Sequence, residues 1–190
     1  MIRARLRIVS VITVVVLTLG CSSSPPAPTP SNPVCGVERW SVKTLTDPDA
    51  TRVDMSNVIS TTITALNGFA TRCSGLPDGR TFAEEFRVYD VIGVVRLTRG
   101  EEDRDVHVVL ADPADLTKTI IVEVVDPACA TTSPLLTTFS NARVQYQNLG
   151  SLVDRRVRVR GVGFYDFEHG QTGRSDNCIE LHPVLSIGTP

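Results

Sequence analysis

Apolar and polar residues alternate over much of the second half of the chain. A period of two is typical of β-strands, because successive side chains point to opposite faces of a sheet. The pattern predicts five strands, at residues 86–98, 105–111, 118–125, 155–165 and 177–187. The first is long and contains Gly93, which permits a bend or bulge. The fifth is expected to be broken at Pro183.

Apolar residues with helical spacing occur between the third and fourth predicted strands. They are Leu135, Phe139, Ala142, Tyr146 and Leu149. We expect Ser133 to cap this helix, Pro134 to open it and Gly150 to end it. Residues 56–70 also have helical spacing, but their threonines favour a strand, so both interpretations stay open there. Residues 73–80 are expected to form a loop.

The predicted order is three strands, one helix and two strands. This is the order of an OB-fold, a five-stranded barrel with a helix between its third and fourth strands. We therefore predict a mainly β protein with an OB-like barrel over residues 86–187. Residues 35–80 would be an N-terminal extension packed outside the barrel. The alternative is a small α+β sheet with the helix on one face.

The N-terminus has the features of an export signal. Arg3, Arg5 and Arg7 precede an apolar run over residues 8–19, which is too short for a permanent membrane span. The run ends in the letters LTLGC, which resemble a lipobox, where the cysteine is acylated and becomes the new N-terminus. The alternative is simple secretion with cleavage elsewhere.

The predicted export signal and cleavage site divide the chain into three parts. Residues 1–20 are the predicted signal peptide, residues 21–34 a Ser/Pro-rich tether, and residues 35–190 a single globular domain. Lipid on Cys21 would hold the domain on the cell membrane, outside the cytoplasm.

Four cysteines remain once Cys21 is lipidated: Cys35, Cys73, Cys129 and Cys178. An even number outside the cytoplasm predicts two disulfides. Three pairings are possible, and spacing does not choose among them. No pair has the short spacing of a zinc site, so we expect neither a structural metal nor another cofactor.

Composition narrows the range of partners. The formal net charge is −2 and aromatic residues make up 5% of the chain, so neither a basic field nor base stacking points to nucleic acid. We expect a protein or an oligomeric ligand at the cell surface instead.

Several stretches resemble a family of uncharacterised, mostly exported bacterial proteins. The segments that show this resemblance are residues 38–44 (ERWSVKT), 105–112 (DVHVVLAD), 161–173 (GVGFYDFEHGQTG) and 177–185 (NCIELHPVL). The family ends in a motif like GVGFFD..HGQ.G...NGIELHPVL, and the resemblance extends from about Glu38 to Ile187. It implies no activity, and its loose link to OB-fold, nuclease-like barrels rests on topology alone.

The chain departs from this motif at Cys178, where the family usually has glycine. The departure implies an additional bridge in this chain. It favours the pairing of Cys73 with Cys178 and of Cys35 with Cys129.

A polar cluster near the C-terminus is the first candidate ligand site. Its members are His169, Gln171, Asn177, Glu180 and His182. Glu180 and His182 share one face of the last strand, and histidine with glutamate can bind a divalent metal or transfer protons. We favour a structural role, with His182 fixing the turn at Pro183. Asp105 and His107 form a similar pair with the same structural interpretation.

A row of arginines on the fourth strand is the second candidate. It comprises Arg155, Arg156, Arg158 and Arg160, the last three alternating with valines. A phosphate backbone could lie along such a row, but a solvated face that discourages edge pairing is the favoured interpretation.

A nuclease-type hydrolase is the third candidate, with carboxylates from residues 101–105 (EEDRD). That run lacks the Asp-Gly-Asp-Thr signature expected for such an enzyme. The chain also lacks a nucleophile elbow, a P-loop and an HExxH motif, so no catalytic residue is assigned. We therefore predict a non-enzymatic binding or interaction domain, with a metal-dependent nuclease-like hydrolase as the alternative.

Overall fold

The computed structural model describes residues 35–36 and 38–190. The predicted signal peptide, Cys21 and the tether lie outside the described residues. Within the described part, no helix is both long enough and apolar enough to span a membrane.

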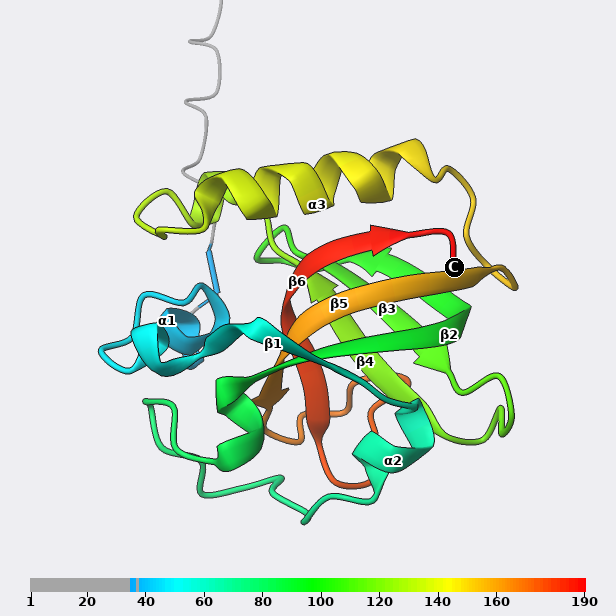
Figure 1. Ribbon diagram of the computed structural model, residues 1–190, viewed down its shortest axis with the longest axis horizontal. Coiled ribbons are helices and arrows are strands. Elements are labelled where there is room, and N and C mark those ends of the chain that lie inside the picture. Colours follow the sequence, from blue (N-terminus) through cyan, green and yellow to red (C-terminus); the bar gives the residue numbers. More distant parts are fainter. Residues whose placement is uncertain (1–34, 37) are drawn as a thin grey trace, which may run out of the picture. The chain divides into compact units, whose positions relative to one another are not determined.

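Five strands close into a mixed β-barrel (Figure 1). They are β2 (Arg87–Gly100), β3 (Val106–Ala111), β4 (Thr119–Val124), β5 (Arg156–Tyr165) and β6 (Ile179–Gly188). Their order is β2-β3-β4-β6-β5, and β5 pairs back onto β2. Only β4 and β6 are parallel neighbours within the barrel. This closed order, with a helix between the third and fourth barrel strands, confirms the predicted OB-fold-like architecture.

The long helix α3 (Leu136–Asn148) lies across the barrel next to β6 (Figure 1). Its apolar face is as predicted, with Phe139 and Ala142 fully buried. The predicted start was wrong, because the helix begins at Leu136. The Ser133 hydroxyl donates to the carbonyl of Thr44 at 2.7 Å, so it ties the helix approach to the N-terminal segment.

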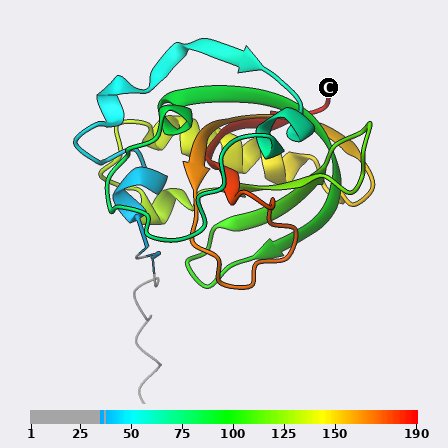
Figure 2. The same cartoon turned by 90° about the horizontal axis from the view of Figure 1, so that it is seen from below.

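The segment before the barrel adds short elements to its outside. These are α1 (Trp40–Lys43), η1 (Ala50–Arg52), β1 (Asp54–Ser60), α2 (Ile63–Asn67) and η2 (Ala83–Phe86). Residues 56–70, for which both a helix and a strand were considered, contain both. The end of β1 is followed by helix α2, which Thr62 caps. Figure 2 shows β1 along the outside of the barrel, where it pairs with β2 in parallel. A further short helix, η3 (Pro127–Cys129), follows β4.

Alternate residues of the barrel strands fill the interior. Val106, Val108 and Leu110 of β3 all point into this core, as the alternation predicted. Gly93 lies in the same core, where a Cβ would meet the Leu110 side chain at 2.8 Å. The bulge of β2 lies between Val95 and Leu97 rather than at Gly93.

The last strand differs from its prediction. It continues through Pro183 and is not broken there. Instead, its pairing with β5 shifts register around Gly161, which is opposite Val184. A strand next to a partner with a register shift can accommodate proline because the ladder is already interrupted there.

Both expected disulfides are present. They join Cys35 to Cys129 and Cys73 to Cys178. Each connects the N-terminal segment to a distant part of the barrel, with sequence separations of 94 and 105 residues. Bridges that close such long loops constrain the unfolded chain strongly.

Candidate functional site

Charged residues gather on the outer face of three neighbouring strands. His107 of β3 and Glu123 of β4 are direct partners in the antiparallel register. Glu180 and His182 project from β6, which is the other neighbour of β4. Because Val108, Val122 and Leu181 point into the core, alternation directs these four polar side chains outward.

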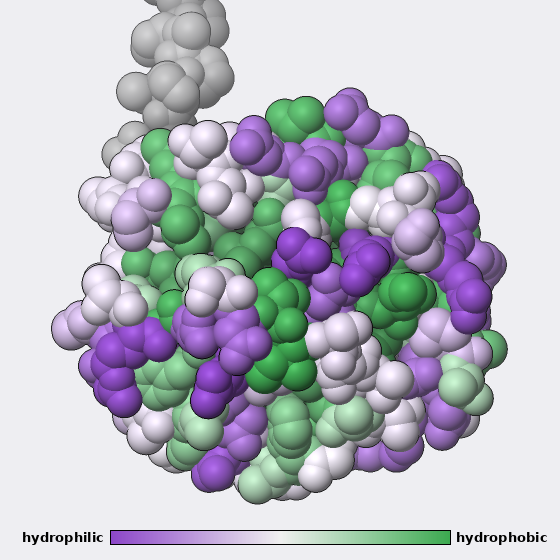
Figure 3. All heavy atoms as spheres, viewed as in Figure 1, coloured by the Kyte–Doolittle hydropathy of each residue, from purple (hydrophilic) through white to green (hydrophobic). Residues whose placement is uncertain are grey.

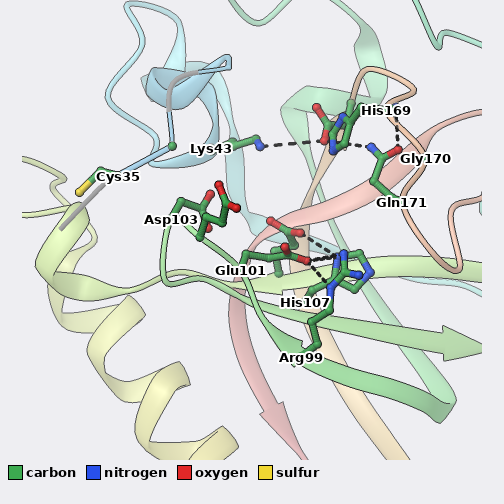
Figure 4. A pocket seen from close by; sticks show the side chains of 13 residues that line it. Cys35, Lys43, Arg99, Glu101, Asp103, His107, His169, Gly170 and Gln171 are labelled. Atoms are coloured by element: carbon green, nitrogen blue, oxygen red, sulfur yellow. Dashed lines mark hydrogen bonds and ion pairs between the residues drawn. The ribbon is translucent and has the colours of Figure 1, made fainter.

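A pocket of about 500 Å³ opens over this face. The β2–β3 loop, the β5–β6 loop and the N-terminal segment enclose it, and Lys43, His107 and Gln171 reach it from different segments (Figure 4). Its charged and polar lining consists of Lys43, Arg99, Glu101, Glu102, Asp103, His107, Glu123, Asp166, His169 and Gln171. Carboxylates therefore outnumber fixed positive charges in the lining.

His107 is oriented from both ends of its ring. Its Nε2 lies 3.1 Å from the carbonyl oxygen of Thr172 in the β5–β6 loop, and a carbonyl only accepts, so Nε2 carries a proton and donates. Its Nδ1 faces Glu123 Oε1 at 3.1 Å and Glu101 Oε1 at 3.3 Å. Burial by itself lowers the pKa of His107, but the contacts with Glu123, Thr172 and Glu101 together outweigh burial and raise it above the usual value.

The close packing of the β5–β6 loop keeps His107 covered. Gly173 has φ of +82°, and a Cβ there would clash with the side chain of Val109. Only a glycine lets the backbone of this loop approach β3 so closely. The approach places the carbonyl of Thr172 against His107 and leaves that side chain 2% exposed.

His182 lies deeper and has no exposed surface. Its Nδ1 is 3.1 Å from Glu123 Oε2, and its Nε2 is 3.4 Å from Asp105 Oδ2. Neither contact has hydrogen-bond alignment, and within the described chain both ring nitrogens and Asp105 Oδ2 have no hydrogen-bond partner. Glu123 therefore lies between two imidazoles, and although burial raises its pKa, these imidazoles lower it well below the usual range.

Lys43 of α1 brings a positive charge to the same face. Its Nζ is 4.0 Å from Asp166 Oδ2, and its side chain is 10% exposed. Burial lowers the pKa of Lys43, but Asp166, Glu123 and Glu180 outweigh burial and raise it.

Glu180 is a buried carboxyl with incomplete hydrogen bonding. It is 1% exposed, and within the described residues its Oε2 has no hydrogen-bond partner. Burial and the nearby carboxylates of Asp166 and Glu123 raise the pKa of Glu180 well above its ordinary value of 4.5. The fold therefore favours the neutral acid at this position.

Three groups of side chains have the geometry of metal ligands. They are Glu101 with His107 and Glu123, Asp105 with Glu123 and His182, and Glu38 with Asp166 and His169. In each group the potential ligand atoms lie within 4.8 Å of one another. All three residues of the first group line the pocket. In the second group Asp105 and His182 are completely buried, and in the third group Asp166 and His169 line the pocket.

The structure divides the predicted C-terminal cluster. Glu180 and His182 join the buried charged group, and His169 and Gln171 line the pocket. Asn177 is elsewhere, because its amide donates to the carbonyl of Leu66 at 2.8 Å and its carbonyl accepts from the Ile179 amide. His182 faces Asp105 and Glu123 and does not fix the turn at Pro183.

The predicted pair of Asp105 and His107 is also separated. Asp105 faces His182, whereas His107 faces Glu101 and Glu123. The residue between them, Val106, points into the barrel.

Two members of the arginine row are paired with a carboxylate. Arg158 and Arg160 both contact Asp90 of β2, at 2.7 and 3.1 Å. Polar and apolar side chains are interspersed over the face in Figure 3, without one continuous hydrophilic field. This arrangement agrees with a solvated face rather than a phosphate-binding surface.

Sequence reasoning missed Lys43, Glu123 and Asp166. Glu123 had a detectable signal, because it is the one charged residue in the apolar strand IIVEVV. Lys43 and Asp166 had no such signal, since tertiary packing alone brings them to the pocket. Comparison with protein families, curated proteins and solved structures found no match. The resemblance to exported bacterial proteins stays a prediction.

Proposed function

We propose that this chain is a lipid-anchored protein, held outside the cytoplasm, whose barrel binds a cationic ligand in the acidic pocket. The observation that carries this proposal is the position of the pocket. OB-folds bind ligands on the face of their second and third strands, between the loops joining strands one to two and four to five. Here those elements are β3, β4, the β2–β3 loop and the β5–β6 loop, and they enclose the pocket.

The lining determines the chemical class of the ligand. OB-folds that bind oligonucleotides use basic grooves and aromatic platforms. This pocket instead presents Glu101, Glu102, Asp103, Glu123 and Asp166. A polyanion would be repelled there, whereas a cation would be attracted.

Binding of organic and inorganic cations tests the pocket. We expect spermidine, as a cationic probe, to bind the full chain by calorimetry and to raise its melting temperature. Affinity should fall in Glu102→Gln and Asp103→Asn, while Glu168→Gln, an exposed acid outside the pocket lining, should leave it unchanged. Binding of single-stranded oligonucleotide at this pocket would contradict the proposal.

The anchor has its own support and its own test. The lipobox-like letters end at Cys21, and two disulfides suit an oxidising compartment. Metabolic labelling with a palmitate analogue should mark the wild-type chain and spare Cys21→Ala. Equal labelling of the wild type and of Cys21→Ala would contradict the proposed lipid anchor at Cys21.

A metal-dependent hydrolase acting on phosphodiesters is a second candidate. One arrangement favours it, namely a histidine, several carboxylates and Lys43 facing one pocket. Hydrolysis of bis(p-nitrophenyl) phosphate in the presence of zinc, abolished in His107→Gln, would support this alternative. The binding function is preferred because the acidic lining opposes an anionic substrate.

A further inference from the structure

We infer that the pocket holds a divalent transition-metal ion, best represented by zinc, with Glu101, His107 and Glu123 as its protein ligands. This inference rests on the proposed function and names the class of cation. The three residues come from the β2–β3 loop, β3 and β4, so the barrel itself positions two of them.

The orientation of His107 is that of a metal-ligating histidine. Such histidines usually donate their second ring N–H to a carbonyl or carboxylate, which fixes the ring and its tautomer. Here Nε2 donates to the carbonyl of Thr172 at 3.1 Å. Nδ1 points to where the Glu101 and Glu123 carboxylates converge, with contacts of 3.3 and 3.1 Å. Without a metal it donates a proton to Glu123, and a metal ion would replace that proton.

Buried polar atoms behind Glu123 give an independent reason for a cation. His182 is completely buried, its Nδ1 is aimed at Glu123 Oε2, and among the described residues its nitrogens have no hydrogen-bond partner. Buried polar groups are normally satisfied, and exceptions point to an ion or a functional role. Once a metal holds Oε1 of Glu123, Oε2 becomes the natural acceptor for His182, as in the outer shell of metal sites.

The ligand chemistry selects the class of ion. Calcium and magnesium prefer sets made of oxygen alone, so an imidazole ligand disfavours both. Imidazole with carboxylates suits zinc and neighbouring transition metals, and affinity along that series rises from manganese to copper and is lower again for zinc. Three protein ligands leave a fourth position open, and it faces the pocket.

The surrounding charge also suits a divalent ion. Glu102, Asp103 and Asp166 line the same pocket beyond the three ligands. Lys43 is held 4.0 Å from Asp166, so its positive charge is partly offset. Arg99 also lines the pocket, and its guanidinium contacts Glu101 Oε1 at 2.8 Å, so both basic side chains of the lining are paired with carboxylates. The excess of carboxylates in the lining attracts a divalent ion, which would share Glu101 with Arg99.

The test is zinc titration of the full-length chain after removal of metal with a chelator. Calorimetry should give one zinc ion per chain, and cobalt should produce the visible absorption of a low-symmetry site. Zinc affinity should fall at least about 100-fold in Glu101→Gln and in His107→Gln. Glu102→Gln removes the same charge from the same pocket, yet its effect should stay under about fivefold.

Controls separate this inference from folding and from the proposed function. Glu168→Gln should bind zinc like the wild type, and circular dichroism should report the fold of each variant. Wild-type zinc affinity in both Glu101→Gln and His107→Gln would overturn the metal site. No zinc binding by a chain that still binds spermidine would overturn the metal site alone, and failure of both ligands would overturn the proposed function as well.

Discussion

Two groups of buried charge contact the ring of Phe164, and they differ in how completely their polar atoms are matched. The Arg39 guanidinium lies over this ring at 4.9 Å, and the His182 imidazole meets it edge to face at 5.5 Å. Arg39 pairs with Glu85 at 2.7 Å, and neither side chain is exposed. His182 faces Glu123 and Asp105 with equal burial of its ring.

The Arg39 group is saturated with hydrogen bonds. Its guanidinium also donates to the carbonyls of Pro77, Gly79 and Tyr165. Glu85 in turn accepts from several backbone amides, those of Thr81, Phe82 and Tyr165. Such a network holds the N-terminal segment against the barrel and leaves nothing for a ligand to bind.

The His182 group is the opposite case. In the described chain, His182, Asp105 and Glu180 all keep polar atoms without hydrogen-bond partners. Complete matching indicates a structural role, whereas incomplete matching next to a pocket indicates a site that a ligand completes. The comparison gives four predictions, beginning with the largest effect.

Arg39→Met should cost about 3–5 kcal/mol of unfolding free energy, because the Glu85 carboxylate stays buried without its partner. Urea denaturation monitored by circular dichroism measures this cost. The matched control is Arg52→Met, which removes an exposed ion pair with Asp49 from the same segment and should cost less than about 1 kcal/mol. Equal costs for both variants would remove the distinction between saturated and exposed pairs.

Gly173→Ala should cost roughly 2–4 kcal/mol, because it combines left-handed backbone strain with overpacking against Val109. It should also weaken zinc binding about 10–100-fold, since Thr172 would no longer orient His107. Gly170→Ala has the same strain, with φ of +84°, but no atom within 4 Å of the new Cβ. Its zinc affinity should match the wild type, and a parallel loss would argue against the role of the loop.

Glu180→Gln should stabilise the domain at neutral pH by about 1 kcal/mol, because it replaces a buried acid with a neutral isostere. The raised pKa of Glu180 means that its contribution is complete below its ordinary pKa of 4.5 and is lost as pH rises through the folded-state pKa. The advantage of the variant should therefore grow between about pH 4 and pH 8. Denaturation at several pH values measures it, and a constant difference would contradict burial as the cause.

Arg158→Gln should have the smallest effect, roughly 0.2–1 kcal/mol, because Arg158 is half exposed and Asp90 keeps its contact with Arg160. Arg156→Gln is the control, since Arg156 lies on the same strand and makes no ion pair with any described residue. If Arg158→Gln lowered the unfolding free energy by several kcal/mol, the Arg158–Asp90 ion pair would resemble the buried Arg39–Glu85 pair and not a solvated surface pair.

Local patterns in the sequence determined much of the fold. Alternation located the barrel strands to within a few residues, and the strand–helix–strand order was enough to predict an OB-like barrel. The apolar face of α3 followed from its spacing, although its first turn did not. There, the Ser133 hydroxyl accepts from the Leu135 amide and also donates to Thr44, and the regular helix begins only at Leu136. Residues 56–70 stayed open because β1 gains its partner only from the distant strand β2.

The site was predicted only in part, for a physical reason. Glu180 and His182 were identifiable because a two-residue spacing on a strand fixes a common face. Their partners Glu123, Asp105 and Lys43 come from other segments, and pairing register and packing decide which charges meet. The sequence thus determined which residues face outward, whereas the closure of the barrel and the loop held down at Gly173 decided that these charges are buried together beside a pocket.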